Sequence, residues 1–130
     1  MTKKELSQLY YLNREIKKDK EKLAELEAKA QRITQQAGKG GGTSGKSDKV
    51  GNYAVEIAEQ KELINIKLRQ CIILQNKIYR YINTIDDSFM RQIIQQRYID
   101  NLSWVRIALN LGGNNTEDSV RMAHNRFLEK

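Results

Sequence analysis

Two long stretches of the chain repeat apolar residues at alternating spacings of three and four, which is the pattern of a helical seam. In residues 2–36 the seam consists of Leu9, Leu12, Ile16, Leu23, Leu26, Ala30 and Ile33, with Asp19 at the one polar position. This spacing places the apolar residues on one face of an α-helix and polar residues on the others. The 130 residues include no proline that would break such a helix. The pattern therefore predicts an all-α protein.

The second stretch, residues 50–83, continues the same spacing. Its expected seam consists of Val50, Ala54, Ile57, Lys61, Ile64, Leu68, Cys71, Gln75, Ile78 and Ile82. Beyond Ile64 the apolar face widens through Ile66, Ile72, Ile73 and Leu74. A wider face predicts that the C-terminal half of this helix packs against more than one neighbour.

The segment between the two seams, residues 38–49, has the composition of a flexible linker. It reads GKGGGTSGKSDK, and glycine is costly inside a helix. We therefore expect an N-terminal coiled helix over 1–37, a linker over 38–49 and a second long helix over 50–83. The linker allows the chain to reverse into a long antiparallel helical hairpin, coiled-coil-like in packing. A homodimer forming a four-helix bundle is expected, because two narrow seams bury little surface; the alternative is a continuous parallel coiled coil.

Residues 40–47, GGGTSGKS, match the phosphate-loop pattern G-x-x-x-x-G-K-[ST]. That loop binds phosphates only when it follows a buried strand and opens a helix. Here the preceding residues, QRITQQAGK, are the polar end of a helix, so a linker is the better interpretation and no nucleotide is expected. The single histidine, His124, and the single cysteine, Cys71, form no metal-binding cluster. We therefore expect no cofactor, no metal and no enzymatic activity.

Residues 84–130 carry three shorter helical patterns. The first pattern places four side chains on one helical face: Phe89, Ile93, Ile94 and Tyr98. Ser103 is a suitable N-cap for the next helix, whose apolar face consists of Ile107, Ala108 and Leu111. Gly112 and Gly113 are expected to end that helix. Thr116 is the expected N-cap of the last helix, in which Val120, Ala123, His124 and Phe127 face inward. The pattern predicts a C-terminal helix-turn-helix three-helix unit.

The stretch RYIDNLSWVRIALNLGG, residues 97–113, resembles region 4 of bacterial sigma factors. More closely, the chain resembles a family of ArpU-like and RinA-like late-gene transcription activators from phages of Gram-positive bacteria. The resemblance covers essentially the whole chain and is sharpest over 97–128. It implies sequence-specific binding of double-stranded DNA and transcription control in the cytoplasm of the bacterial host. The turn between Leu111 and Val120 is longer here than in the usual motif.

Recognition-helix side chains that face away from the core are the candidates for reading DNA. Arg121 suits guanine and Asn125 suits adenine, whereas Asn114, Asn115 and Thr116 are placed to donate to phosphates. The predicted DNA-binding residues are Asn114, Asn115, Thr116, Ser119, Arg121, Met122, Asn125 and Arg126. Trp104 is expected to belong to the core.

The net charge of +7 is unevenly distributed along the chain. Residues 1–46 carry eleven basic and six acidic side chains, but residues 86–130 carry six of each. A neutral helix-turn-helix unit neutralises few phosphates on its own, and a dimer would offset this by presenting two copies. Two alternatives therefore remain: a sigma-like module that binds RNA polymerase, and a small-terminase-like DNA-packaging or assembly protein. No run of apolar residues is long enough to span a membrane, so no membrane association is expected.

Overall fold

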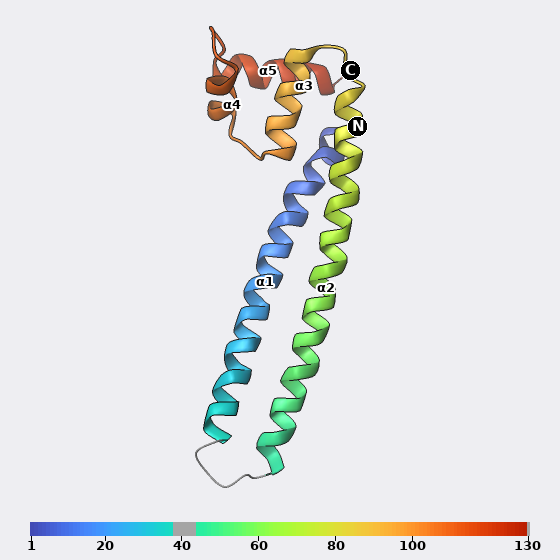
Figure 1. Cartoon of the computed structure of the whole chain (residues 1–130). Helices are drawn as coiled ribbons and strands as arrows, with labels where there is room; N and C mark the ends of the chain where they lie inside the picture. The colour runs from blue at the N-terminus through green and yellow to red at the C-terminus, as the bar shows by residue number, and fades with distance from the viewer. Residues whose placement is uncertain (38–43, 130) are drawn as a thin grey trace. The chain divides into compact units, whose positions relative to one another are not determined.

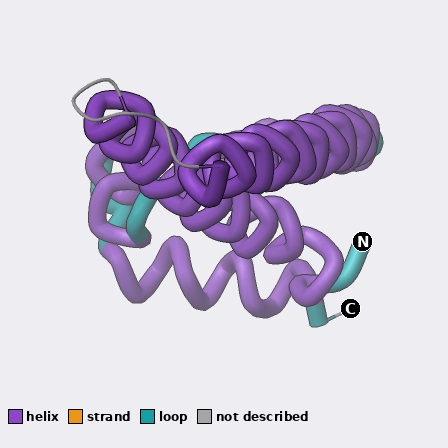
Figure 2. Tube along the Cα trace, turned by 90° about the horizontal axis from the view of Figure 1, so that it is seen from below, coloured by secondary structure: helices purple, strands orange, loops and turns teal. Residues whose placement is uncertain are grey.

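The computed structural model describes residues 1–37 and 44–129, with the side chains of 1–35 and 51–129. Its helices in chain order are α1 (Lys3–Ala37), α2 (Ser44–Asn83), α3 (Ser88–Ile94), the π-helix η1 (Gln95–Ile99), α4 (Trp104–Leu111) and α5 (Glu117–Leu128) (Figure 1). These residues contain no strand (Figure 2). The all-α prediction is confirmed for the described ranges. Within them, no helix combines the length and the apolar character that crossing a membrane requires.

Helix α1 ends where the first long helix was expected to end, but α2 begins at Ser44, six residues before the predicted start at residue 50. The predicted linker 38–49 is thus wrong over 44–49, and 38–43 lie outside the described residues. A single glycine, Gly45, costs a helix only about 1 kcal/mol, and each residue added to an existing helix gains a hydrogen bond. The phosphate-loop match at 40–47 follows helix α1 rather than a strand.

The long helices α1 and α2 pack together. The chain divides into two compact units, each of which contains part of both helices. The first unit comprises residues 1–12 and 71–130, and the second comprises residues 13–70.

In the second unit, α1 follows its predicted seam. Ile16 and Leu26 are buried, and Leu23, Ala30 and Ile33 are half-buried. The residues between them are exposed, apart from the half-buried Asp19. Because every inward position matches the three-and-four spacing, this part of the seam is confirmed.

Over residues 51–70 the seam of α2 differs from the prediction at alternate positions, whereas Cys71, Ile78 and Ile82 are buried as predicted. Ile57 and Ile64 face inward as expected, but the positions between them and after them are Gln60 and Lys67 rather than Lys61 and Leu68. Gln60 is 7% exposed, whereas Leu68 is 38% exposed. The predicted spacing contains more apolar residues, whereas the observed spacing brings the polar side chains of Gln60 and Lys67 to Asp19.

Asp19 is the centre of a polar cluster inside the second unit. Lys67 Nζ lies 2.6 Å from Asp19 Oδ2 and 3.3 Å from Glu15 Oε2. Gln60 Nε2 donates to the backbone carbonyl of Asp19 at 2.9 Å. The hydrogen bond with Asp19 raises the pKa of Lys67 above its ordinary value. A polar residue in a helical seam is tolerated when partners satisfy it, and here Lys67 pairs with the Asp19 carboxylate while Gln60 binds the Asp19 backbone carbonyl.

The first unit has a denser core. Leu6 of α1 and Ile78 of α2 are fully buried, together with Ile93, Ile94, Ile107 and Val120 from the C-terminal helices. Helix α5 packs against α3 and α4, and η1 packs against α3 and α4. Helix α3 begins at the N-cap Asp87, whose carboxylate accepts from the Phe89 amide. The predicted inward faces of residues 84–130 therefore meet in one core.

One expectation about α2 is wrong. Ile66, Ile72, Ile73 and Leu74 were predicted to widen the packed face; Leu74 is half-buried, but the three isoleucines are 42%, 58% and 67% exposed. Within the described part of a single chain, no element covers these side chains. These three apolar side chains of α2 are therefore exposed to solvent in a single chain.

Candidate nucleic-acid interface

The turn between α4 and α5 is shaped by two glycines and an asparagine. Gly112 and Gly113 have φ angles of 70° and 63°, in the left-handed region that favours glycine. Asn115 Nδ2 donates to the carbonyl of Gly112 at 2.7 Å. Helix α4 begins at Ser103, whose hydroxyl accepts from the Arg106 amide, so the predicted N-cap and the predicted glycine stop are both confirmed.

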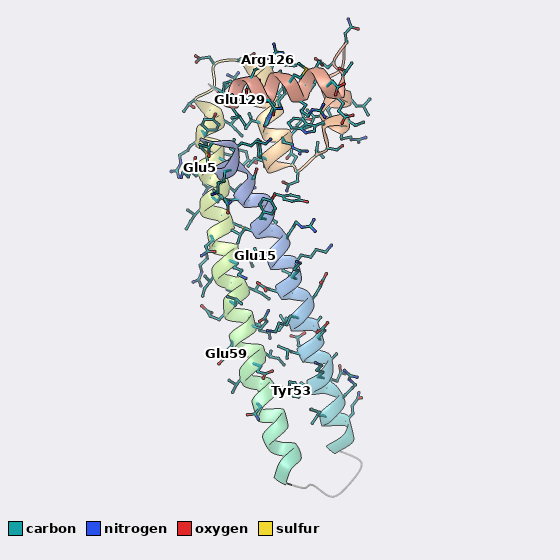
Figure 3. All side chains as sticks on the ribbon, turned by 180° about the vertical axis from the view of Figure 1, so that it is seen from behind. Glu5, Glu15, Tyr53, Glu59, Arg126 and Glu129 are labelled. Carbon is teal, nitrogen blue, oxygen red and sulfur yellow. The ribbon has the colours of Figure 1, made fainter. Side chains whose placement is uncertain are left out.

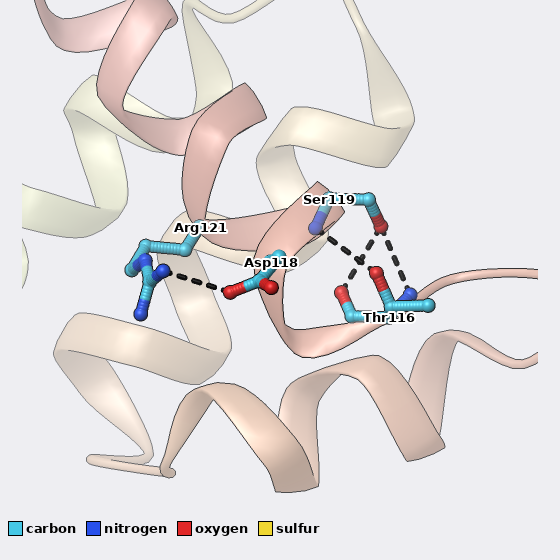
Figure 4. A network of polar contacts seen from close by, with 4 residues as sticks. All are labelled: Thr116, Asp118, Ser119 and Arg121. Carbon is cyan, nitrogen blue, oxygen red and sulfur yellow. Dashed lines mark hydrogen bonds and ion pairs between the residues drawn. The ribbon is translucent and has the colours of Figure 1, made fainter.

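Helix α5 begins with a reciprocal capping arrangement (Figure 4). Thr116 Oγ1 accepts from the Ser119 amide at 3.1 Å, and Ser119 Oγ accepts from the Thr116 amide at 2.9 Å. Ser119 Oγ also lies 3.0 Å from the carbonyl of Thr116, to which it donates. The predicted N-cap at Thr116 is confirmed. Both hydroxyls are exposed but are already engaged in fixing the start of the helix.

The outward face of α5 presents two arginines and a methionine. Met122 is 55% exposed, and the side chain of Arg121 is 44% exposed. Arg126, labelled in Figure 3, is also exposed. Its Nε lies 3.4 Å from the carbonyl of Met122. Arg121 forms an ion pair with Asp118 one turn earlier, at 2.8 Å (Figure 4). Both partners are exposed, so this pair is weakly held and open to exchange.

The inward face of α5 is anchored by Val120 and His124, each fully buried. His124 Nε2 lies 2.6 Å from the Tyr98 hydroxyl, and His124 Nδ1 lies 2.9 Å from Asn125 Oδ1. Because the amide oxygen can only accept, Nδ1 carries the proton and Nε2 accepts from Tyr98. Burial lowers the pKa of His124 and raises the pKa of Tyr98 to about 12, so it favours the neutral form of both groups.

An aromatic cluster extends from His124 to the surface. The Trp104 ring lies edge-on to His124, with centroids 4.7 Å apart. The Arg97 guanidinium lies 4.3 Å above the Trp104 ring and donates to the Leu102 carbonyl at 3.0 Å. Trp104 is half-buried, and its contacts are with other side chains of the first unit, which fits the expectation of a core residue.

The structure brings the predicted DNA-binding residues onto one turn and one helix. Asn114, Arg121, Met122 and Arg126 are exposed there, as are Thr116 and Ser119. Asn115 and Asn125 are half-buried and hydrogen-bonded within the unit. Asn125 therefore offers its amide nitrogen more freely than its oxygen, because the oxygen already accepts from His124.

Sequence reasoning did not anticipate the π-helix η1 or the Tyr98–His124–Asn125 chain. The π-helix shows in the hydrogen bond from the Asp100 amide to the Gln95 carbonyl, at 3.0 Å. An inward histidine and an inward tyrosine were both visible in the helical pattern. The hydrogen bond between Tyr98 and His124 depends on how α5 packs against η1. The spacing of residues within one helix does not predict that packing.

Comparisons with protein-family models, with curated proteins and with solved structures found no match for this chain.

Proposed function

We propose that this chain is a sequence-specific DNA-binding protein of the phage type, and a transcriptional regulator related to late-gene activators. In this proposal α4, the glycine turn and α5 form a helix-turn-helix, and α5 enters the major groove. The protein acts as a dimer in the cytoplasm of a bacterial host cell. It uses no cofactor and no metal, and it catalyses no reaction.

The observation that carries the proposal is the two-sided character of α5. One side is held in the core by Val120 and His124, and the other presents Arg121, Met122 and Arg126 to solvent. A helix packed across a preceding short helix, with cations on its free side, has the arrangement that major-groove recognition requires. Arginine binds guanine through two hydrogen bonds, and these contacts supply sequence preference.

Asp118 sets the energetics of this recognition. In the free protein it holds Arg121 in an ion pair, so a guanine must replace the carboxylate for Arg121 to read it. The carboxylate also repels the phosphate backbone. Asp118→Asn is therefore expected to strengthen DNA binding, whereas Arg121→Ala is expected to weaken binding to a preferred site by about 1–3 kcal/mol.

The test is an affinity selection of sheared bacterial and phage DNA with the purified protein at near-physiological salt, followed by sequencing. Recovery of a few shared sites, weakened by Arg121→Ala and Arg126→Ala, is the expected result. Arg69→Ala is the matched control, because it removes the same charge from an exposed position on α2. Uniform recovery, or equal losses in all three variants, would overturn the proposal.

We also propose that α1 and α2 form an antiparallel hairpin. In support, Glu15 and Asp19 are paired with Lys67, whereas Glu27, further along α1, is paired with Lys61, earlier along α2. A second copy of the chain is the expected partner of this hairpin. Val55 and Ile66 of the second unit are 58% and 42% exposed and lie eleven residues apart, which is three helical turns.

Sedimentation analysis tests the dimer. A two-chain species that dissociates in Ile66→Lys is expected, and Asn65→Lys, which adds the same charge at an exposed position on another face of α2, is the control. A monomer at all concentrations would reject the proposed dimer. A ring of more than two chains would favour the small-terminase-like packaging or assembly role instead.

A second candidate is a sigma-like module that binds host RNA polymerase. It is favoured by the exposed apolar side chains of α4, since Val105 is 51% and Leu109 is 68% exposed, one turn apart. It is also favoured by the zero net charge of residues 86–130. Co-purification with polymerase, lost in Leu109→Asp, without a salt-sensitive DNA complex would select this candidate.

A further inference from the structure

A pocket of about 450 Å³ lies in the first unit, between the start of α1 and the segment from η1 to the start of α4. Its walls include Lys3 and Ser7 of α1 on one side and Arg97 and Ser103 on the other. The volume falls within the range of small-molecule sites, and the opening to solvent leaves an entry path. Neither the predicted DNA-binding residues nor the helical seam accounts for this pocket.

The pocket is positively charged. Lys3 and Arg97 both line it, and none of the described residues that line it is acidic. Among the described residues, neither cation forms an ion pair with a carboxylate. Arg97 donates to the Leu102 carbonyl through one of its amino groups, and a guanidinium has five N–H donors. Because Lys3 and Arg97 line the same pocket and neither is paired with a carboxylate of the described residues, the pocket favours an anionic ligand.

The pocket is also aromatic. Tyr10, Tyr11 and Tyr98 line it, and the Tyr10 and Tyr11 rings meet edge-on with centroids 5.4 Å apart. Tyr11 is 58% exposed, so its ring is accessible to a ligand. Offset and edge-to-face ring contacts would hold a planar ring between these side chains.

The backbone that forms one wall is irregular. Arg97 and Tyr98 belong to the π-helix η1, and Asn101 has a φ of 56°, in the left-handed region. Single π-turns and left-handed non-glycine residues occur frequently where side chains must be aimed at a site. Here the irregular segment directs a cation and an aromatic residue toward the same pocket.

We propose that this pocket binds a small aromatic phosphate, with the ring against the tyrosines and the phosphate between Lys3 and Arg97. The hydroxyls of Ser7 and Ser103 complete the polar rim. Ser103 is the N-cap of α4, so the positive end of that helix lies beside the same rim. The proposal goes beyond DNA recognition by α5 and does not depend on it.

Calorimetric titration of the full chain tests the proposal, with phenyl phosphate, adenosine 5′-monophosphate, inorganic phosphate and adenosine as the four probes. At least one aromatic phosphate should bind about tenfold more tightly than both inorganic phosphate and adenosine, since ring and phosphate contribute together. The preference between the first two probes distinguishes a single-ring ligand from a nucleotide. Binding of none, or no advantage over inorganic phosphate, would overturn the proposal.

Variants locate the site. Lys3→Gln should weaken binding about tenfold, and Tyr11→Ala by a smaller factor, because each removes one side of the contact. Lys4→Gln is the matched control, as the neighbouring exposed lysine does not line the pocket. Trp104 is the only tryptophan and lies under Arg97, so its fluorescence should change on binding. Equal weakening in Lys3→Gln and Lys4→Gln would place the ligand elsewhere.

Discussion

The two units of this chain use the same long helices in different ways. In the first unit α1 and α2 contribute to a core that fully buries Leu6, Ile78, Ile93 and Ile107. In the second unit the most buried apolar residues, Ile16, Leu26 and Ile64, each retain 5–8% exposure. Two helices alone cannot enclose a side chain, whereas additional helices close over it. The first unit is therefore stabilised mainly by burying apolar side chains. In the second unit a polar cluster determines which residues of α1 and α2 face each other.

The largest expected effect compares one substitution in both units. Ile93→Ala should reduce the free energy of unfolding by about 2–5 kcal/mol, because a fully buried side chain leaves a cavity. Ile64→Ala should cost less, because the second unit is thinner and solvent reaches the site. Urea unfolding followed by circular dichroism measures both. Equal losses would mean that the two units are equally packed.

The next effect concerns the polar cluster in the second unit. Lys67→Met should cost about 1–3 kcal/mol, because Asp19, with its side chain 18% exposed, loses its cation. Adding Asp19→Leu should restore the stability, since an apolar pair needs no compensation. The double variant should also pair its helices less uniquely, which crosslinking between introduced cysteines would detect. A double variant as unstable as the single one would show that the cluster acts only through packing.

A smaller effect compares two glycines. Gly113→Ala should destabilise the chain by about 1 kcal/mol, because φ is 63° there. Gly51→Ala should stabilise it by about 0.5–1 kcal/mol, because Gly51 lies within helix α2. An added Cβ meets nothing within 4 Å at either position, so the backbone alone decides the sign. Thermal unfolding measures both, and the same sign for the two would contradict the assigned backbone conformations.

A final, smaller effect is a dependence of the first unit's stability on pH that comes from His124. Burial lowers the pKa of His124 below its ordinary value of 6.5, so the unfolded chain binds this proton more readily. The contribution of His124 to the free energy of unfolding is therefore fully present above pH 6.5, and it declines as the pH falls below 6.5. Urea midpoints measured on either side should differ more in the wild type than in His124→Gln. An equal difference in both would assign the dependence to other groups.

The sequence predicted the local features of both units well. The α1 seam and the caps at Ser103 and Thr116 followed from spacing and residue type. The choice between Lys67 and Leu68 for the α2 seam could not be made locally. The two alternatives differ by one residue, and the partner that decides between them, Asp19, lies in another helix. Periodicity favoured Leu68, the more apolar residue, whereas pairing the half-buried Asp19 carboxylate favoured Lys67.

For the candidate interface, the sequence predicted which positions of α5 are exposed but did not predict the contacts between their side chains. The outward positions of α5 followed from helical periodicity, so Arg121 and Arg126 were correctly placed on its exposed face. The engagement of Asn125 with His124, and of Arg121 with Asp118, required side-chain geometry. These contacts decide which polar groups on α5 are available to another molecule, and helical periodicity does not predict them.

The most direct test of the central claim, that the first unit binds DNA through α5, is hydrogen exchange of the full chain with and without short random-sequence duplexes. At low salt, where phosphate contacts dominate, the account predicts added protection at 114–128, in the turn and α5, and none at 51–69 of α2. Protection confined to the long helices, or its absence everywhere at saturating DNA, would contradict the account.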